Sequence, residues 1–126
     1  MNNSSVEYAR VSLGRICVIA LTRNGGVSRA PYQSLNLGSH VGDKPENVLA
    51  NFEIVRRYLN AEGLTYLQAN HGTTVNLATS FGEAPSGDGL ITKTPKHAIV
   101  ALSADCVPVA LIDPVNEVIE IGRAHV

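Results

Sequence analysis

The sequence is poor in cysteine, in charged residues and in long hydrophobic runs. Its 126 residues include only Cys17 and Cys106, which are too few for a disulfide framework. Charged residues make up 17%, below the roughly 25% that is typical of soluble domains, whereas hydrophobic residues make up 44%. The most apolar stretch, residues 99–112, is too short to span a bilayer and contains Asp105. We therefore expect one folded domain over residues 1–126, without a membrane segment.

Two further absences bear on partners and on location. Ten Lys and Arg residues against eleven Asp and Glu residues leave a net charge of -1, and neither sign is concentrated in one segment. This distribution argues against nucleic-acid binding, which needs a basic patch. Residues 1–10 are polar and lack the basic and then apolar progression of a secretory signal. We therefore expect a cytoplasmic protein that binds neither nucleic acid nor a membrane.

Short apolar runs rich in β-branched residues predict strands over much of the chain. They span residues 15–22, 65–69, 74–78, 98–103 and 107–112. Cys17 lies in the first run, where we expect a small residue buried in the core rather than a reactive thiol. Residues 79–89 are predicted as a loop, and residues 113–116 as a type I turn with Pro114 at its second position.

One helix is predicted, after a long loop. Residues 23–43 are rich in Gly, Ser and Asn and lack a helical or strand period, which predicts an ordered loop. Apolar residues then recur at helical spacing, with Asp43 in position to cap the helix, Pro45 in its first turn and Gly63 at its end. One helix among many strands indicates an α+β fold with few helices.

Two residues at the ends of predicted strands have side chains suited to chemistry. His71 lies where a strand enters a turn, in Gln68-Ala69-Asn70-His71-Gly72, and Cys106 lies just before Pro108, near the start of a strand. A neutral imidazole and a thiolate suit a zinc ion, and they equally suit a cysteine nucleophile with a histidine base. The sequence has no CxxC or HExxH motif that would decide between them. A core thiol and a surface histidine are the third interpretation, and all three stay open on spacing alone.

A longer series of motifs resembles one protein family. In chain order the motifs are Gly25-Gly26-Val27-Ser28, Pro31-Tyr32-Gln33-Ser34-Leu35-Asn36-Leu37-Gly38, His40-Val41-Gly42-Asp43, Gln68 with His71-Gly72, Asp88-Gly89 and Ala104-Asp105-Cys106-Val107-Pro108-Val109. The series runs from Arg23 to Ile119 and resembles the laccase-domain family, also called YfiH-like or polyphenol oxidase, which is assigned as a purine nucleoside phosphorylase. The resemblance implies the YfiH-like laccase-domain fold of mixed β-sheets.

The resemblance also implies a zinc site. In that family the metal is held by the His of the His-Gly motif, the Cys of Ala-Asp-Cys-x-Pro, and a second His in Ala-His-Ala-Gly-Trp-Arg-Gly. The first two fall on His71 and Cys106. Three protein ligands with an open fourth position are typical of a catalytic zinc. The chain has four histidines in total, too few for the imidazole ligands of a multicopper site, so we expect zinc rather than copper.

The activity that the resemblance implies is phosphorolysis of adenosine and inosine to free base and ribose 1-phosphate, so purine nucleosides and phosphate are the expected partners. Adenosine deamination, for which zinc-bound hydroxide is a nucleophile, and methylthioadenosine phosphorolysis are implied as related activities. We expect Arg23, Ser34 and Asn36 to contribute substrate-binding donors, and Asp105 to orient a ligand. For Asn36, a turn residue that bonds its own backbone is an equal alternative.

The end of the chain departs from the family pattern. It reads Glu120-Ile121-Gly122-Arg123-Ala124-His125-Val126, and the spacing from Cys106 places the family's second histidine where Arg123 stands. The same residues are encoded by GAGATCGGAAGAGCACACGTC, which apart from its first base resembles a common sequencing-library adapter. We therefore expect residues 120–126 to be non-native, and the Gly-Trp-Arg-Gly stretch and the C-terminal half of a family member to be missing.

This departure shapes the expected function of the chain. We expect the full-length parent to be the enzyme, and the 126-residue chain to bind zinc poorly and to be inactive. Two alternatives stay open. One is a cysteine hydrolase with Cys106 as nucleophile and His71 as base. The other is a non-catalytic fragment that binds nucleosides without turning them over.

Overall fold

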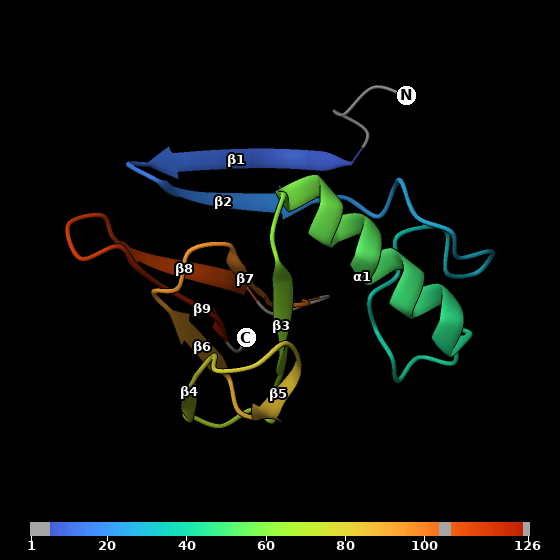
Figure 1. Cartoon of the computed structure of the whole chain (residues 1–126). Helices are drawn as coiled ribbons and strands as arrows, with labels where there is room; N and C mark the ends of the chain where they lie inside the picture. Colours follow the sequence, from blue (N-terminus) through green and yellow to red (C-terminus); the bar gives the residue numbers. More distant parts are fainter. Residues whose placement is uncertain (1–5, 104–106, 125–126) are drawn as a thin grey trace. The chain divides into compact units, whose positions relative to one another are not determined.

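The computed structural model describes residues 6–103 and 107–124, which form one helix and nine strands (Figure 1). In chain order the elements are β1 (Glu7–Leu13), β2 (Ile16–Leu21), α1 (Pro45–Leu59), β3 (Gly63–Gln68), β4 (Val75–Leu77), β5 (Gly82–Ser86), β6 (Gly89–Thr92), β7 (His97–Val100), β8 (Val107–Asp113) and β9 (Val118–Ala124). The predicted α+β fold with mixed sheets is confirmed. Within these residues no helix has the length and apolar character needed to cross a membrane.

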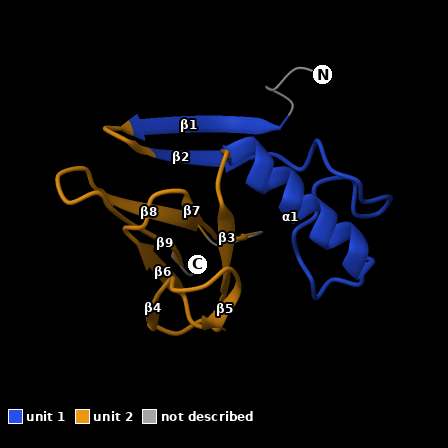
Figure 2. Cartoon of the chain, in the orientation of Figure 1, with its two compact units in different colours: residues 1–12, 17–59 blue, residues 13–16, 60–126 orange. Residues whose placement is uncertain are grey.

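The chain divides into two compact units, which Figure 2 shows in different colours. One unit comprises Met1–Ser12 and Cys17–Leu59, and contains α1 with most of β1 and β2. The other comprises Leu13–Ile16 and Asn60–Val126, and contains β3 to β9.

Cys17 lies on β2, the first predicted strand, but its side chain is exposed, so its predicted place in the core is wrong. In the described part of the chain β2 pairs only with β1, which sequence analysis did not predict. The six residues of β1 from Tyr8 to Leu13 are all exposed, so neither face of this strand is buried, and the apolar composition of a run does not show whether its strand will be covered. The Ser12 hydroxyl donates a hydrogen bond to Cys17 Sγ at 3.6 Å.

The predicted helix is confirmed as α1, but it ends before Gly63, which starts β3 instead. Its last residue is Leu59, and Asn60 then takes a left-handed φ of 53°, a conformation that ends many helices. At the other end the Asp43 carboxylate accepts the N–H of Lys44 at 2.8 Å. Because the helix begins at Pro45, Lys44 rather than Asp43 occupies the cap position.

The long loop over residues 23–43 is held by one buried side chain of the helix. Asn51 is 0% exposed, and its Oδ1 accepts the N–H of Val27 at 2.8 Å. Its Nδ2 donates to Ser28 Oγ at 2.9 Å and to the carbonyl of Asn36 at 2.8 Å. A buried amide must find such partners, and here they come from both halves of the loop. The ordered loop that the sequence predicts is therefore organised around α1.

The second unit contains a three-stranded sheet, β5-β3-β7, and a four-stranded sheet, β4-β6-β9-β8. The first is parallel throughout, whereas in the second β4 pairs with β6 in parallel and β9 pairs antiparallel with both β6 and β8. Side chains from both sheets form one apolar core. Its members are Leu67, Ala84 and Leu90, with Ile99, Ala101 and Ile121 packed against them.

Sequence analysis missed three of these strands in whole or part. β5 falls inside the predicted loop 79–89, and its Pro85 fits because β5 lies at the edge of its sheet, where a missing N–H is tolerated. β6 and β9 also carried no prediction. The predicted turn before β9 is confirmed: Asp113 Oδ1 accepts the N–H groups of Val115 at 3.0 Å and of Asn116 at 3.1 Å.

Replacing Asn51 tests whether the loop depends on α1. Asn51→Ala should lower the free energy of unfolding by about 3 kcal/mol, because it leaves loop N–H and C=O groups without their buried partner. Urea unfolding followed by circular dichroism measures the change. As a control on the same helix, Leu49→Ala, at a position 68% exposed, should cost less than about 0.5 kcal/mol. Equal losses in both variants would contradict the proposed dependence.

Glu7 joins β1 to α1 within the first unit. Its carboxylate accepts hydrogen bonds from Arg10 Nη2 at 2.6 Å and from Tyr58 Oη at 2.6 Å. These donors, Arg10 first and Tyr58 second, lower the pKa of Glu7 from 4.5 to about 2. A carboxyl whose pKa is lowered by folding stabilises the fold above its ordinary pKa, and this stabilisation disappears as the pH falls through the folded-state pKa.

This linkage predicts how the effect of Glu7→Gln depends on pH. The variant should be less stable than the wild type near neutral pH, and the difference should shrink as the pH falls from 4.5 to about 2. Urea midpoints of both proteins across this range measure it. Glu62→Gln, at an exposed carboxylate outside the cluster, is the control. A Glu7→Gln deficit that stays constant down to pH about 2 would contradict the coupling.

Candidate active site

The carboxyl ends of three parallel strands meet at one edge of the β5-β3-β7 sheet. β3 pairs with β5 as far as Gln68↔Ser86, and with β7 as far as Tyr66↔Val100. Because all three strands run in the same direction, the segments that follow them leave the sheet from the same edge. Sites for ligands commonly form at such an edge, where side chains on successive loops can meet.

Each of these three segments carries a residue of the motifs described above. His71 follows β3, Asp88 follows β5, and Cys106 follows β7. Cys106 lies outside the described residues, as do Asp105 and His125. The structure therefore brings His71 and Asp88 together at this edge, with His71 on the exposed turn that the sequence predicts.

The Asp88 carboxylate accepts hydrogen bonds from successive backbone N–H groups of the His71 turn. Its Oδ1 accepts the N–H of His71 at 3.0 Å and of Asn70 at 3.3 Å, and its Oδ2 accepts the N–H of Gly72 at 2.5 Å. Asp88 is only 8% exposed. His71 has a φ of 59°, a left-handed conformation that costs about 1–2 kcal/mol for a residue other than glycine. The bonds to Asp88 offset this cost.

Sequence analysis assigned no role to Asp88, although Asp88-Gly89 is one of the motifs. The signal was a carboxylate between Gly87 and Gly89, in a segment without apolar periodicity. Its partners could not be found this way, because they lie in the turn after β3 and become neighbours of Asp88 only through the register of β3 with β5.

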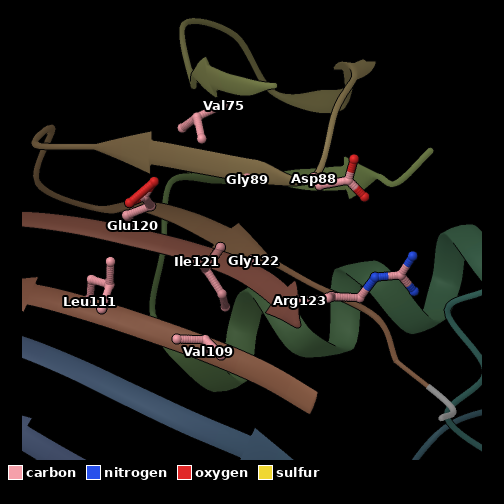
Figure 3. A pocket seen from close by; sticks show the side chains of 9 residues that line it. All are labelled: Val75, Asp88, Gly89, Val109, Leu111, Glu120, Ile121, Gly122 and Arg123. Carbon is pink, nitrogen blue, oxygen red and sulfur yellow. The ribbon is translucent and has the colours of Figure 1, made fainter. Parts of the chain in front are cut away.

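A cavity of about 190 Å³ lies against the four-stranded sheet, close to this turn (Figure 3). Its lining residues are Val75, Asp88, Gly89, Val109, Leu111, Glu120, Ile121, Gly122 and Arg123. The backbones of β6 and β9 pair there at Gly89↔Gly122, so Asp88, which directly precedes β6, and Arg123 on β9 lie at the same end of the cavity. Position 123, where the resemblance expects a histidine, therefore lies next to the residue that holds the His71 turn.

Arg123 is an incompletely satisfied cation in this cavity wall. Its Nη1 donates a hydrogen bond to the carbonyl of Leu102 at 3.0 Å. Its Nε is buried and has no hydrogen-bond partner among the described residues. A buried N–H without a partner costs free energy.

The described residues contain no group of three or more His, Cys, Asp and Glu side chains that could hold a metal ion. Of the ligands that the resemblance implies, His71 is placed by the structure, and the chemistry of an imidazole at a turn on the sheet edge fits a metal ligand.

Arg23 and Ser34, two of the predicted substrate-binding residues, are joined within the loop of the first unit. Arg23 Nε donates to the carbonyl of Gln33 at 2.9 Å, and its own carbonyl accepts the N–H of Ser34 at 2.8 Å. Ser34 Oγ accepts the N–H of Gly26 at 3.1 Å. The structure brings these two residues together, and the bonds they make shape the loop itself.

Asn36 is the third predicted substrate-binding residue. It makes the bond to nearby backbone that is expected of a turn residue, which was the alternative to substrate binding. Its Oδ1 accepts the N–H of Gly38 at 3.0 Å, and its Nδ2 donates to Asp43 at 3.1 Å. Ser28 Oγ also donates to Asp43, at 2.5 Å. The bonds from Ser28 and then from Asn36 lower the pKa of Asp43. Asp43 thus remains an anion that closes the loop onto the start of α1.

The edge of parallel strands, the His71 turn and the motif series define a chain of the laccase-domain class. The family described as multi-copper polyphenol oxidoreductase laccase matches residues 17–126, and the chain belongs to this family. Among solved structures, the Neisseria meningitidis protein NMB0706 is 38% identical with a TM-score of 0.73, covering 84% of this chain and 44% of its own. The Bacillus licheniformis hypothetical protein YfiH is 29% identical with a TM-score of 0.77, covering 86% and 45%.

Curated relatives carry the name purine nucleoside phosphorylase. The Mycobacterium tuberculosis relative is 34% identical over 135 residues, which cover 96% of this chain and 53% of the relative. The Streptomyces griseus relative is 40% identical over 109 residues, which cover 82% and 44%. The chain spans about half the length of the curated relatives it matches. These comparisons confirm the family resemblance and the fold that the sequence predicts.

Proposed function

We propose that this chain carries part of the active site of a zinc-dependent purine nucleoside phosphorylase, in which His71 and Cys106 are two of the zinc ligands. The observation that carries the proposal is the hydrogen bonding of the Asp88 carboxylate to the His71 turn, where the parallel strands β5 and β3 end. The names of the relatives support the reaction. Because those relatives are about twice as long as the matched segment, we assign turnover to the longer protein.

In this proposal some residues of the chain would bind the metal and others would bind the substrate. The neutral imidazole of His71 and the thiolate of Cys106 would hold zinc, which supplies a Lewis acid and, for deamination of adenosine, an activated water. Asp105 would orient a ligand, and Arg23, Ser34 and Asn36 would contribute donors for phosphate or nucleoside. Related activities on adenosine and methylthioadenosine belong to the same proposal.

A chimera tests the proposed reaction directly. It joins residues 1–119 to the remaining C-terminal part of the Streptomyces griseus relative, and phosphate-dependent release of hypoxanthine from inosine is measured. We expect release by the chimera and none by the 126-residue chain. His71→Ala in the chimera should lower the rate by more than about 100-fold, because loss of a ligand should exceed the 10–100-fold typical of residues that support one.

His40→Ala is the matched control in the same chimera, since His40 is an exposed loop histidine outside the proposed site. It should leave both the rate and the zinc content unchanged. A folded chimera that contains zinc and releases no hypoxanthine would contradict the assigned reaction. Full activity of the His71→Ala chimera would contradict the role of His71.

Position 123 gives a test on the chain itself. Arg123→His should raise its affinity for zinc about tenfold or more, because it replaces a poorly satisfied cation by a neutral ligand next to Asp88. Competition with a chromogenic chelator measures the affinity. Glu120→His places the same side chain elsewhere on β9 and should have no such effect. Equal gains from both variants would show that the added histidine binds zinc without the proposed geometry.

A further inference from the structure

We propose that Asp88 is the positioning residue for His71: its buried carboxylate fixes the backbone from which the imidazole projects. The inference rests on the proposed function, in which His71 binds zinc. It goes further because it assigns a task to a residue in another loop, which contacts the backbone of the ligand rather than the metal.

The bonds to the turn fix both its shape and its orientation. Asn70, His71 and Gly72 present successive N–H groups to one carboxylate, an arrangement in which backbone amides form a concave site for an anion. Bonds to a charged acceptor are about twice as strong as neutral ones. These bonds hold the backbone of His71 at a φ of 59°. Residues other than glycine rarely adopt this conformation unless the surrounding structure enforces it.

Asp88 is itself braced from both ends of the turn. The N–H of Gly87 donates to the carbonyl of Gln68 at 2.8 Å, before the turn, and the N–H of Asp88 donates to the carbonyl of Thr74 at 2.9 Å, after it. The N–H of Gly89 shares the Thr74 carbonyl at 3.2 Å. The backbone that carries the Asp88 carboxylate is therefore tied to both ends of the turn that the carboxylate supports.

The two glycines beside Asp88 allow this close approach. A Cβ at Gly87 would lie 2.8 Å from Asn76 Nδ2 and 3.0 Å from the carbonyl of Thr74, and a Cβ at Gly89 would lie 3.0 Å from a methyl group of Val75. Side chains at either position would push the segment away from the turn. The Gly87-Asp88-Gly89 sequence thus brings a carboxylate to the backbone of another loop.

A metal ligand needs this support because an imidazole must lie within a few tenths of an ångström of its place to bind well. His71 sits on an exposed turn, so the position of its backbone contributes directly to the position of the imidazole. Asp88, in the segment between β5 and β6, holds that backbone through the N–H of His71.

Zinc binding by the chimera described above and amide resonances of the turn test the inference together. Zinc affinity is measured by chelator competition for the chimera with the wild-type residues and for its variants Asp88→Asn, Asp88→Glu and His71→Ala. Asp88→Asn should lower the affinity about 10–100-fold, the range for residues that support a ligand. In the same protein without metal, the amide protons of His71 and Gly72 should shift upfield, because they lose a charged acceptor. Asp88→Glu keeps the charge but displaces the carboxylate. The zinc affinity of this variant should therefore lie between that of the wild type and that of Asp88→Asn.

Asp113→Asn is the matched control, since Asp113 also accepts two backbone N–H groups but in the turn before β9. It should not change the zinc affinity. Should Asp88→Asn fail to fold, Asp88→Glu carries the test. Zinc affinity within twofold of the wild type, despite shifted amide protons of His71, would overturn the role of Asp88. If His71→Ala itself binds zinc as the wild type does, the zinc proposal fails instead, so the two failures are distinguishable.

Discussion

The parallel register of β3 with β5 and β7 is the constraint on which the site depends. It sets Gln68 opposite Ser86, and so places the segment after β5 beside the turn after β3. A shift of one residue would move Asp88 by about 3.3 Å along the sheet, beyond reach of the His71 amide. The same shift of β5 would turn Ala84 out of the apolar core, because successive side chains point to opposite faces. Burial of Ala84 therefore helps to fix the geometry of the polar turn.

The sequence predicts those parts of the fold whose local pattern agrees with their final environment. β2, β3, β7 and β8 are apolar runs, and α1 has a helical repeat, so each is recognisable without its neighbours. β5 is not recognisable in this way, because Gly82 and Pro85 are residues typical of turns. They are tolerated in β5 because this strand lies at the edge of its sheet and pairs on one side only. Cys17 shows the opposite limit: its run predicts a strand correctly, yet the exposure of one residue depends on which face of the hairpin is covered.

The site shows the same division between local and long-range information. His71 was predictable because an imidazole in a Gly-containing turn after a strand is a local feature, reinforced by the motif series. The role of Asp88 was not, since its partners lie in the turn after β3 and become its neighbours only through pairing of β3 with β5. Asn36 was ambiguous for a third reason, because from the sequence alone an asparagine in this loop could bind either the substrate or the loop backbone. In the structure its side chain forms hydrogen bonds with Gly38 and Asp43 within the loop.

Both units solve one physical problem in the same way. An irregular loop has backbone N–H and C=O groups that no ladder satisfies, and each must find a partner. In the first unit Asn51 supplies both a donor and an acceptor to the loop over residues 23–43, and an amide suits this task because it can do both. In the second unit the turn presents only donors, and a carboxylate, which only accepts, matches it. The choice of asparagine in one place and aspartate in the other follows from the polarity of the backbone groups that each must satisfy.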